Sequence, residues 1–201
     1  MATAAGPVQA DESVRLEDPA GEVIAAVLEE PGLRGLAAEL LGPSWVLVTN
    51  RHNHAVIDHG GGSRGTRMHR DLLHWSRSPI TLLLMLDCAP DDPQAWPSLI
   101  PGSHLWPTSE PSNGGGYWLD EAPEPELAGQ AVKVPMNPGD VLVMDGMTYH
   151  SAGLGSPDRA RVMVTLCLRT PDELTGEAGP NEQLVAGSIR YEGQPRWRRN
   201  G

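Results

Sequence analysis

Glycine and proline occur throughout the chain and divide its apolar stretches into short segments. The 201 residues include 23 glycines and 19 prolines, together about a fifth of the chain, which is well above average usage. Both residues interrupt regular secondary structure and concentrate in turns. This distribution argues against a helix bundle and favours many short strands joined by turns.

Apolar patterning predicts where the strands lie. Residues 80–88 form a nearly all-apolar stretch, as expected of a strand buried on both faces. Residues 161–169 form a second clear strand, which follows the turn sequence Gly155-Ser-Pro-Asp158. Further strands are expected at residues 45–49, 54–58, 66–71, 131–136 and 141–144.

Helical spacing is confined to residues 21–41, where Pro31-Gly32 should separate two short helices. Such helices are expected to cover the outside of a sheet. The fold class is therefore predicted to be mainly β, a barrel or sandwich with short N-terminal helices packed outside. Residues 1–20 are expected to form a loose tail and residues 21–201 a single domain, in which an insert at 107–129 acts as a lid.

Charge and composition exclude several classes of partner. The net charge of −11 disfavours nucleic acid and anionic membrane surfaces. The longest apolar run, residues 80–86, is far shorter than the about 20 residues of a membrane helix. The N-terminal residues lack a secretory signal pattern, and Cys88 and Cys167 lie in apolar segments typical of buried free thiols. We therefore expect a cytoplasmic protein, monomeric or homodimeric, whose partner is a small molecule.

Histidine placement is the most informative feature for chemistry. His69 and Asp71 lie two residues apart in an expected strand, so both side chains share one face, with Cα atoms about 6.5 Å apart. His150 lies at the exit of another expected strand. Two imidazoles and one carboxylate on one face form a ligand set that suits Fe(II), and Zn(II) competes on ligand type alone. Arg70 should point away from this face into a solvated basic cluster.

Arg161 opens the strand that follows His150 and is a candidate carboxylate-binding residue. A guanidinium at this position can reach into a barrel and bind a carboxylate through two parallel hydrogen bonds. Arg159, two positions earlier, is the alternative for the same role.

Four motifs in order resemble one enzyme family. They are His69-Arg-Asp71, Ile100-Pro-Gly-Ser-His104, Pro138-Gly-Asp140, and His150 followed by Arg161. The chain, over roughly residues 20–170, resembles the phytanoyl-CoA dioxygenase-like branch of the Fe(II)/2-oxoglutarate-dependent oxygenases. The resemblance implies a double-stranded β-helix, a jelly-roll barrel, which agrees with the strand pattern.

The same resemblance implies roles for individual residues. His69, Asp71 and His150 would bind Fe(II), and Arg161 would bind the distal carboxylate of 2-oxoglutarate, with Thr81 as a second hydrogen-bonding partner of that carboxylate. Three further residues are candidates for substrate contacts: His52, His104 and Trp118. The implied reaction uses dioxygen to hydroxylate or otherwise oxidise a C–H bond of a small molecule, for example a natural-product intermediate, and releases succinate and CO₂.

Two alternatives remain open from the sequence. In a cupin, the same barrel holds a metal without 2-oxoglutarate, and here His52, His54 and His150 would be the ligands. A cupin would also supply a glutamate, which is absent here, and Asp58 is the nearest carboxylate to these histidines in the sequence. The second alternative is a non-catalytic barrel that binds a small molecule.

Overall fold

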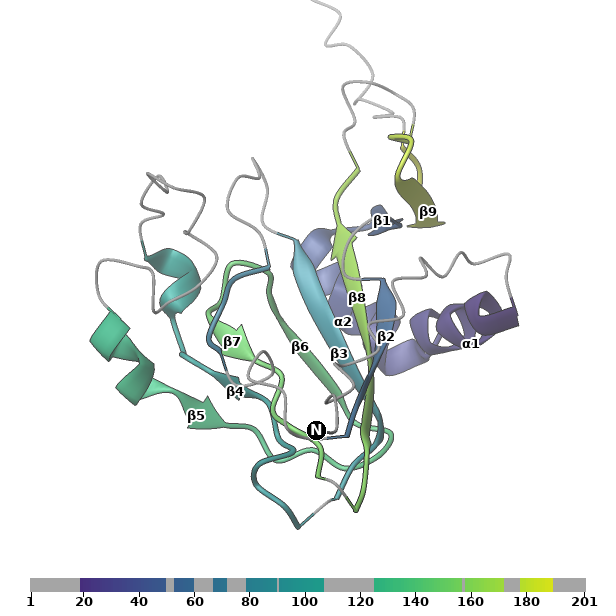
Figure 1. The fold of residues 1–201 in the computed structure, drawn as a ribbon. Coiled ribbons are helices and arrows are strands. Elements are labelled where there is room, and N and C mark those ends of the chain that lie inside the picture. Colours follow the sequence, from purple (N-terminus) through teal and green to yellow (C-terminus); the bar gives the residue numbers. More distant parts are fainter. Residues whose placement is uncertain are drawn as a thin grey trace, which may run out of the picture.

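Two long neighbouring strands, β3 (Ile80–Asp87) and β8 (Arg161–Arg169), form the middle of the larger of two antiparallel sheets (Figure 1). Their apolar composition explains their length and central position, since both of their faces are covered. On one side of this pair lies β6 (Val141–Asp145), which pairs with β3. The computed structural model describes residues 19–49, 53–59, 67–71, 79–89, 91–106, 125–156, 158–171 and 178–189.

Two strands share the other side of β8. The strand β2 (His54–Asp58) pairs with residues 161–165, and β1 (Trp45–Val48) pairs with residues 168–169. The strand β9 (Glu182–Ala186) pairs with β1 and completes the order β6–β3–β8–β1–β9.

The smaller sheet has the order β5–β4–β7 and consists of two-residue strands. These are β4 (Ser98–Leu99), β5 (Val132–Lys133) and β7 (His150–Ser151). A single bridge between His69 and His150 adds the segment 67–71 to β7. Two 3₁₀ helices, η2 (Ser103–Leu105) and η4 (Pro125–Gln130), lie close in sequence to β4 and β5.

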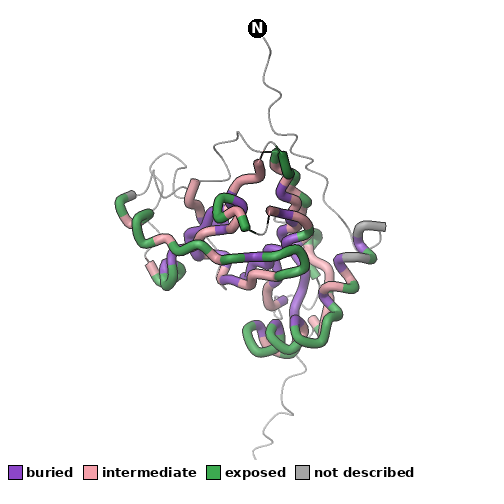
Figure 2. Tube along the Cα trace, turned by 90° about the horizontal axis from the view of Figure 1, so that it is seen from below, coloured by how far each residue is buried: buried purple, intermediate pink, exposed green. Residues whose placement is uncertain are grey.

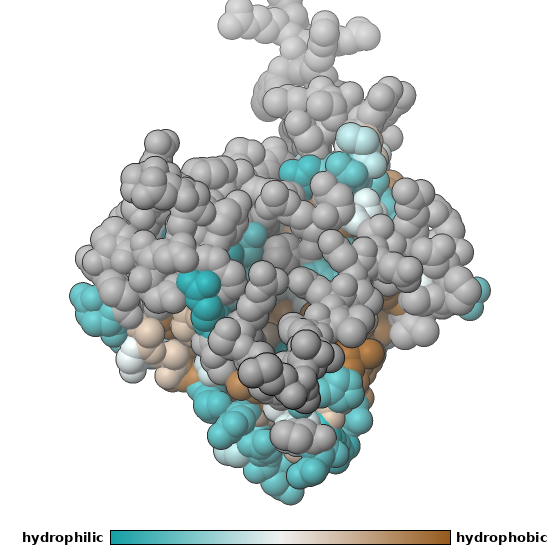
Figure 3. All heavy atoms as spheres, in the orientation of Figure 1, coloured by the Kyte–Doolittle hydropathy of each residue, from teal (hydrophilic) through white to brown (hydrophobic). Residues whose placement is uncertain are grey.

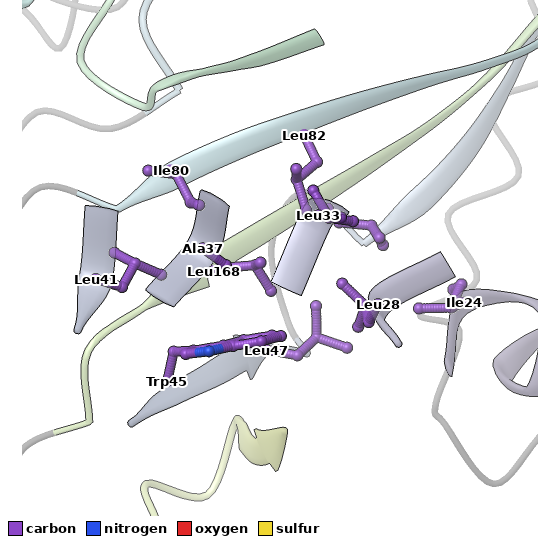
Figure 4. Packing of buried hydrophobic residues seen from close by; sticks show 11 residues of the cluster. Ile24, Leu28, Leu33, Ala37, Leu41, Trp45, Leu47, Ile80, Leu82 and Leu168 are labelled. Atoms are coloured by element: carbon purple, nitrogen blue, oxygen red, sulfur yellow. The ribbon is translucent and has the colours of Figure 1, made fainter. Parts of the chain in front are cut away.

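The helices α1 (Pro19–Leu28) and α2 (Pro31–Leu41) cover one face of the larger sheet (Figure 1). The break between them is explained by Pro31 at the start of α2 and by Glu30, whose carboxylate accepts a hydrogen bond from the Leu33 backbone N–H. Figure 4 shows the core that results between the helices and the sheet. Its buried members are Ile24, Leu28, Leu33, Ala37, Leu41, Trp45, Leu47, Ile80, Leu82, Leu166 and Leu168.

The opposite face of the larger sheet looks toward the smaller sheet and carries a second core. Because side chains alternate along a strand, Leu83 and Met85 of β3 and Met163 of β8 share this inner face. Arg161, Thr165 and Cys167 follow the same alternation on β8. The tube in Figure 2 shows buried stretches through the middle of the molecule and exposed turns around it. Figure 3 shows hydrophilic residues over much of the described surface, with smaller apolar areas between them.

The mainly β architecture with short helices outside is confirmed, but several boundaries differ from the prediction. The helix α1 begins at Pro19, inside the predicted tail. Of the strand predicted at 66–71, the described residues 67–71 contribute a single bridge, between His69 and His150. The strand β9 was not predicted, since residues 171–201 lack a clear alternating pattern. Of the insert predicted at 107–129, residues 107–124 lie outside the described residues and 125–129 belong to η4, so its role as a lid stays a prediction.

Cys88 and Cys167 are buried free thiols, as predicted. Burial raises the pKa of Cys167 to about 12, and the nearby charge of Asp71 acts in the same direction. In the described part of the chain, no helix is long and apolar enough to cross a bilayer.

Candidate metal centre

Three side chains converge beside the inner face of the larger sheet. The Asp71 Oδ1 atom lies 3.6 Å from His69 Nε2 and 3.4 Å from His150 Nε2. One ligand atom from each residue lies within 4.8 Å of the others. Asp71 and His150 are buried, and His69 retains partial exposure, so the group is open on one side.

Backbone hydrogen bonds place these side chains together although 80 residues lie between His69 and His150 in the sequence. His69 and His150 exchange both backbone hydrogen bonds, each 2.8 Å long. Residues paired in this way across antiparallel strands direct their side chains to the same face. The Asp71 N–H donates to the Gly146 carbonyl (3.2 Å), which ties the third ligand to the turn before β7.

Both imidazoles are oriented by the backbone so that their Nε2 atoms face Asp71. His69 Nδ1 lies 3.1 Å from the Arg67 carbonyl oxygen, and His150 Nδ1 lies 3.0 Å from the Thr148 carbonyl oxygen. A carbonyl oxygen only accepts, so each Nδ1 is assigned as the protonated nitrogen. Each Nε2 then keeps a lone pair for a metal ion.

Thr81 orients the carboxylate. Its hydroxyl donates a 2.7 Å hydrogen bond to Asp71 Oδ2, and its side chain is fully buried. This bond occupies the oxygen that faces away from the histidines and leaves Oδ1 directed toward their Nε2 atoms. The donor set therefore fits a divalent ion that prefers two imidazoles and one carboxylate and keeps open coordination positions, as Fe(II) does.

The hydrogen bond found for Thr81 differs from the predicted one to a cosubstrate carboxylate. Thr81 lies opposite Cys167 on β8, six residues from Arg161. At about 3.3 Å per residue the two backbone positions are about 20 Å apart along the strand, and the Arg161 side chain runs back from its end toward Met163. In this structure the Thr81 hydroxyl donates to the metal-ligand candidate Asp71, and its predicted contact with a cosubstrate carboxylate stays a prediction.

Arg161 lies on the inner face, deep between the sheets. It is 1% exposed, and its Nη1 donates to the Met163 sulfur (3.5 Å), two residues closer to the Thr81 end of β8. Its Nη2 lies 3.7 Å from Asp58 Oδ2, while its Nε has no hydrogen-bond acceptor among the described residues. Burial lowers the pKa of Arg161, and the charge of Asp58 opposes this shift. Arg159, the alternative, forms an exposed ion pair with Asp87 and does not enter the barrel.

Arg70 is buried, contrary to the solvated position that was predicted. Its Nη2 donates to the carbonyls of Ser103 (2.6 Å) and Trp106 (3.2 Å), and its Cζ lies 4.3 Å from the Tyr149 ring centroid. The Tyr149 N–H in turn donates to Ser103 Oγ (2.8 Å). Arg70 and Tyr149 each adjoin a metal-ligand candidate, so these contacts hold the two ligand segments against η2.

We expect Arg70→Met to lower the free energy of unfolding by about 2–3 kcal/mol, because it removes a buried cation–π contact and the two hydrogen bonds that the guanidinium donates to the Ser103 and Trp106 carbonyls. Chemical denaturation of the metal-free protein measures this change. Arg34→Met is the matched control: Arg34 also lies over a ring, that of Trp45, at 6.0 Å, but is not buried. A loss for Arg70→Met no larger than for this control would contradict the role assigned to Arg70.

The other predicted site residues are distributed as follows. His104 is exposed on η2, and the neighbouring Ser103 makes the buried contacts of that turn instead. His52 and Trp118 lie outside the described residues, so their substrate roles stay predictions. His54 is not part of the ligand group formed by the described residues, which disfavours the cupin ligand set. Ser103 belongs to the Ile100–His104 motif and Asp58 was considered only as a cupin carboxylate, so neither was predicted in the contacts that it makes here.

Solved structures with the same fold include enzymes of natural-product metabolism. The structure of the epimerase SnoN in complex with Fe³⁺, alpha ketoglutarate and nogalamycin RO is 18% identical, with a TM-score of 0.61; the match covers 90% of this chain and 84% of SnoN. AviO1 from Streptomyces viridochromogenes Tue57 is 23% identical over 78% of this chain and 62% of its own, with a TM-score of 0.50. These similarities confirm the jelly-roll fold.

EvdMO1 is 26% identical over 73% of this chain, with a TM-score of 0.53. The matched region amounts to 32% of EvdMO1, so the chain spans about a third of that protein. Comparison with curated protein sequences finds no match. A family model described as phytanoyl-CoA dioxygenase (PhyH) matches residues 2–162, a range that contains His69, Asp71, His150 and Arg161. The chain therefore belongs to the phytanoyl-CoA dioxygenase (PhyH) family.

Proposed function

We propose that the protein is an Fe(II)- and 2-oxoglutarate-dependent oxygenase that oxidises a C–H bond of a small molecule, such as an intermediate of natural-product biosynthesis. The observation that carries this proposal is the convergence of His69 Nε2, His150 Nε2 and Asp71 Oδ1, with the remaining polar atoms of these side chains hydrogen-bonded elsewhere. Membership of the PhyH family supports it.

The metal and cosubstrate supply the oxidising chemistry: dioxygen and 2-oxoglutarate are converted to succinate and CO₂ as one oxygen atom is transferred to the substrate. The protein's contribution is to bind and orient these groups and to exclude water. His69, Asp71 and His150 would hold the ion on one side and leave the other side open for cosubstrate and dioxygen.

Arg161 is the residue best placed to bind the distal carboxylate of 2-oxoglutarate. It is buried, always charged, and extends along the barrel from the end opposite the metal ligands. Its Nε has no acceptor among the described residues and is available to donate to a ligand. A dicarboxylate that reaches from the metal to this guanidinium would satisfy it through a two-donor contact.

Hydroxylation is the simplest outcome of this arrangement. All three protein ligands are present, so no ligand position is vacated for a halide ion. The SnoN structure, which has the same fold, is that of an epimerase, so epimerisation is the alternative outcome. We propose hydroxylation as the reaction to be tested first.

The proposal is tested by anaerobic titration of the purified protein with Fe(II) and 2-oxoglutarate. We expect the visible charge-transfer band of a 2-oxo acid chelated to Fe(II), absent when either component is omitted. A cupin that does not use 2-oxoglutarate would bind Fe(II) without the band, and a non-catalytic barrel would bind no Fe(II); either result would reject the proposal. Candidate substrates are then screened by the succinate that they release in air.

Thr81→Val should weaken metal binding about tenfold, because Val has the shape of Thr but cannot donate to Asp71 Oδ2. Thr81→Ser keeps the donor and should bind metal nearly as well as the wild type. The measurement is Co(II) titration followed by ligand-field absorption, without cosubstrate. If Val and Ser variants bind Co(II) equally, the hydrogen bond does not position the ligand. If Thr81→Val instead weakens only 2-oxoglutarate binding at saturating metal, the original prediction for Thr81 is right.

A further inference from the structure

A carboxylate lies beside the buried guanidinium that the proposed function assigns to the cosubstrate. Asp58 on β2 is paired directly opposite Arg161 on β8, and the two strands are neighbours in Figure 1. Residues opposite each other in an antiparallel pair project to the same face, so Asp58 also points into the barrel. Its Oδ2 atom lies 3.7 Å from Arg161 Nη2, and its side chain is 14% exposed.

The backbone keeps this pair in place. The turn before β8 runs so close to the end of β2 that a Cβ added to Gly155 would overlap the Asp58 carbonyl oxygen. Five consecutive residue pairs join β2 to β8 and end at Asp58 and Arg161. The carboxylate is therefore a fixed feature of the anchor region rather than a surface group that approaches it by chance.

We propose that Asp58 sets the affinity for the cosubstrate: it neutralises Arg161 before the cosubstrate binds and opposes the carboxylate that arrives there. The inference rests on the proposed function, in which Arg161 receives the distal carboxylate of 2-oxoglutarate. A guanidinium buried without a counterion would strongly destabilise the fold, and Asp58 offsets that cost in the absence of ligand.

Asp58 opposes binding of the second carboxylate through its negative charge, and not by using up the hydrogen-bond donors of Arg161. Arg161 Nε has no acceptor among the described residues, and Nη1 contacts only a weakly accepting sulfur, so donors remain for a second carboxylate. The incoming carboxylate nevertheless meets a cation whose charge is already balanced, and it comes close to a like charge where solvent screens little. Asp58 thus lowers the affinity for any 2-oxo acid with an anionic distal end and leaves 2-oxo acids with a neutral end unaffected.

The experiment compares two ligands on the Fe(II)-loaded protein. 2-Oxoglutarate carries the distal carboxylate, whereas 2-oxopentanoate has the same carbon chain with a methyl end; both chelate through the 2-oxo acid group, and the charge-transfer band reports both affinities. We expect Asp58→Asn to bind 2-oxoglutarate about tenfold more tightly, equal to about 1.4 kcal/mol, with no change for 2-oxopentanoate. Thermal unfolding without ligand should occur at a lower temperature than in the wild type.

Asp87→Asn is the matched control. It removes one negative charge from the exposed pair that Asp87 forms with Arg159 and should change neither affinity. Asp58→Ser also removes the charge and should show the same gain in affinity for 2-oxoglutarate, so it tests the inference if the Asn variant fails to fold. Asp58→Glu keeps the charge and should show no gain in that affinity.

Unchanged or weaker 2-oxoglutarate binding in the charge-removing variants would overturn the inference, as would an equal gain for 2-oxopentanoate. These outcomes differ from failure of the proposed function, in which the wild type itself gives no band with 2-oxoglutarate.

Discussion

Replacing Asp71 with Ala is expected to weaken binding of Fe(II) or Co(II) at least about a hundredfold, more than the loss of a group that only orients a ligand. Asp71 Oδ1 is the atom nearest to both His Nε2 atoms and supplies the only negative charge of the ligand group. Two neutral imidazoles would remain, and they neither balance the charge of the ion nor define a third ligand direction. His150→Ala should have an effect of similar size, because His150 is the more buried of the two histidines.

Metal titration under anaerobic conditions measures these changes, with Co(II) as the probe that does not oxidise readily. His104→Ala and Asp158→Ala are matched controls, since both replace an exposed residue of the same type outside the ligand group. Thermal unfolding without metal shows whether each variant is folded. A folded Asp71→Ala variant that keeps wild-type affinity would mean that other residues hold the ion.

The longest strands and the metal ligands could be predicted because local sequence determines them. Residues 80–87 and 161–169 are mostly apolar, and the strands β3 and β8 match the predicted ranges almost residue for residue. His69 and Asp71 share a face through their two-residue spacing, so their proximity needed only an extended backbone. His150 was grouped with them from its position at the exit of an expected strand, the family resemblance implied the same role, and the structure brings it to the same point.

The contacts around the ligands could not be predicted because they depend on tertiary pairing. Arg70 is hydrophilic and follows a basic stretch, yet its position over Tyr149 exists only once the segments 67–71 and β7 are bridged. The hydrogen bond from Thr81 to Asp71 depends on where tertiary pairing places the segment 67–71 beside β3. The strand β9 carries no strong strand pattern of its own and forms by pairing with β1.

Arg161→Leu should lower the affinity for 2-oxoglutarate about a hundredfold, because truncating a charged anchor of a carboxylate costs about 2–5 kcal/mol. The loss includes two effects: the two-donor contact disappears, and Asp58 remains beside the distal carboxylate without its cation. Arg161→Lys keeps the charge but not the planar pair of donors and should bind with intermediate affinity. The charge-transfer band at saturating Fe(II) measures each affinity.

Arg159→Leu tests whether Arg159, two residues before Arg161, binds the distal carboxylate instead. Arg159 is exposed and paired with Asp87, so its loss should leave 2-oxoglutarate binding unchanged. Co(II) affinity without cosubstrate should be the same in both Leu variants, because neither arginine belongs to the ligand group. If Arg159→Leu lost the cosubstrate and Arg161→Leu kept it, the carboxylate would bind at the barrel surface. The buried guanidinium and its pairing with Asp58 would then serve stability alone.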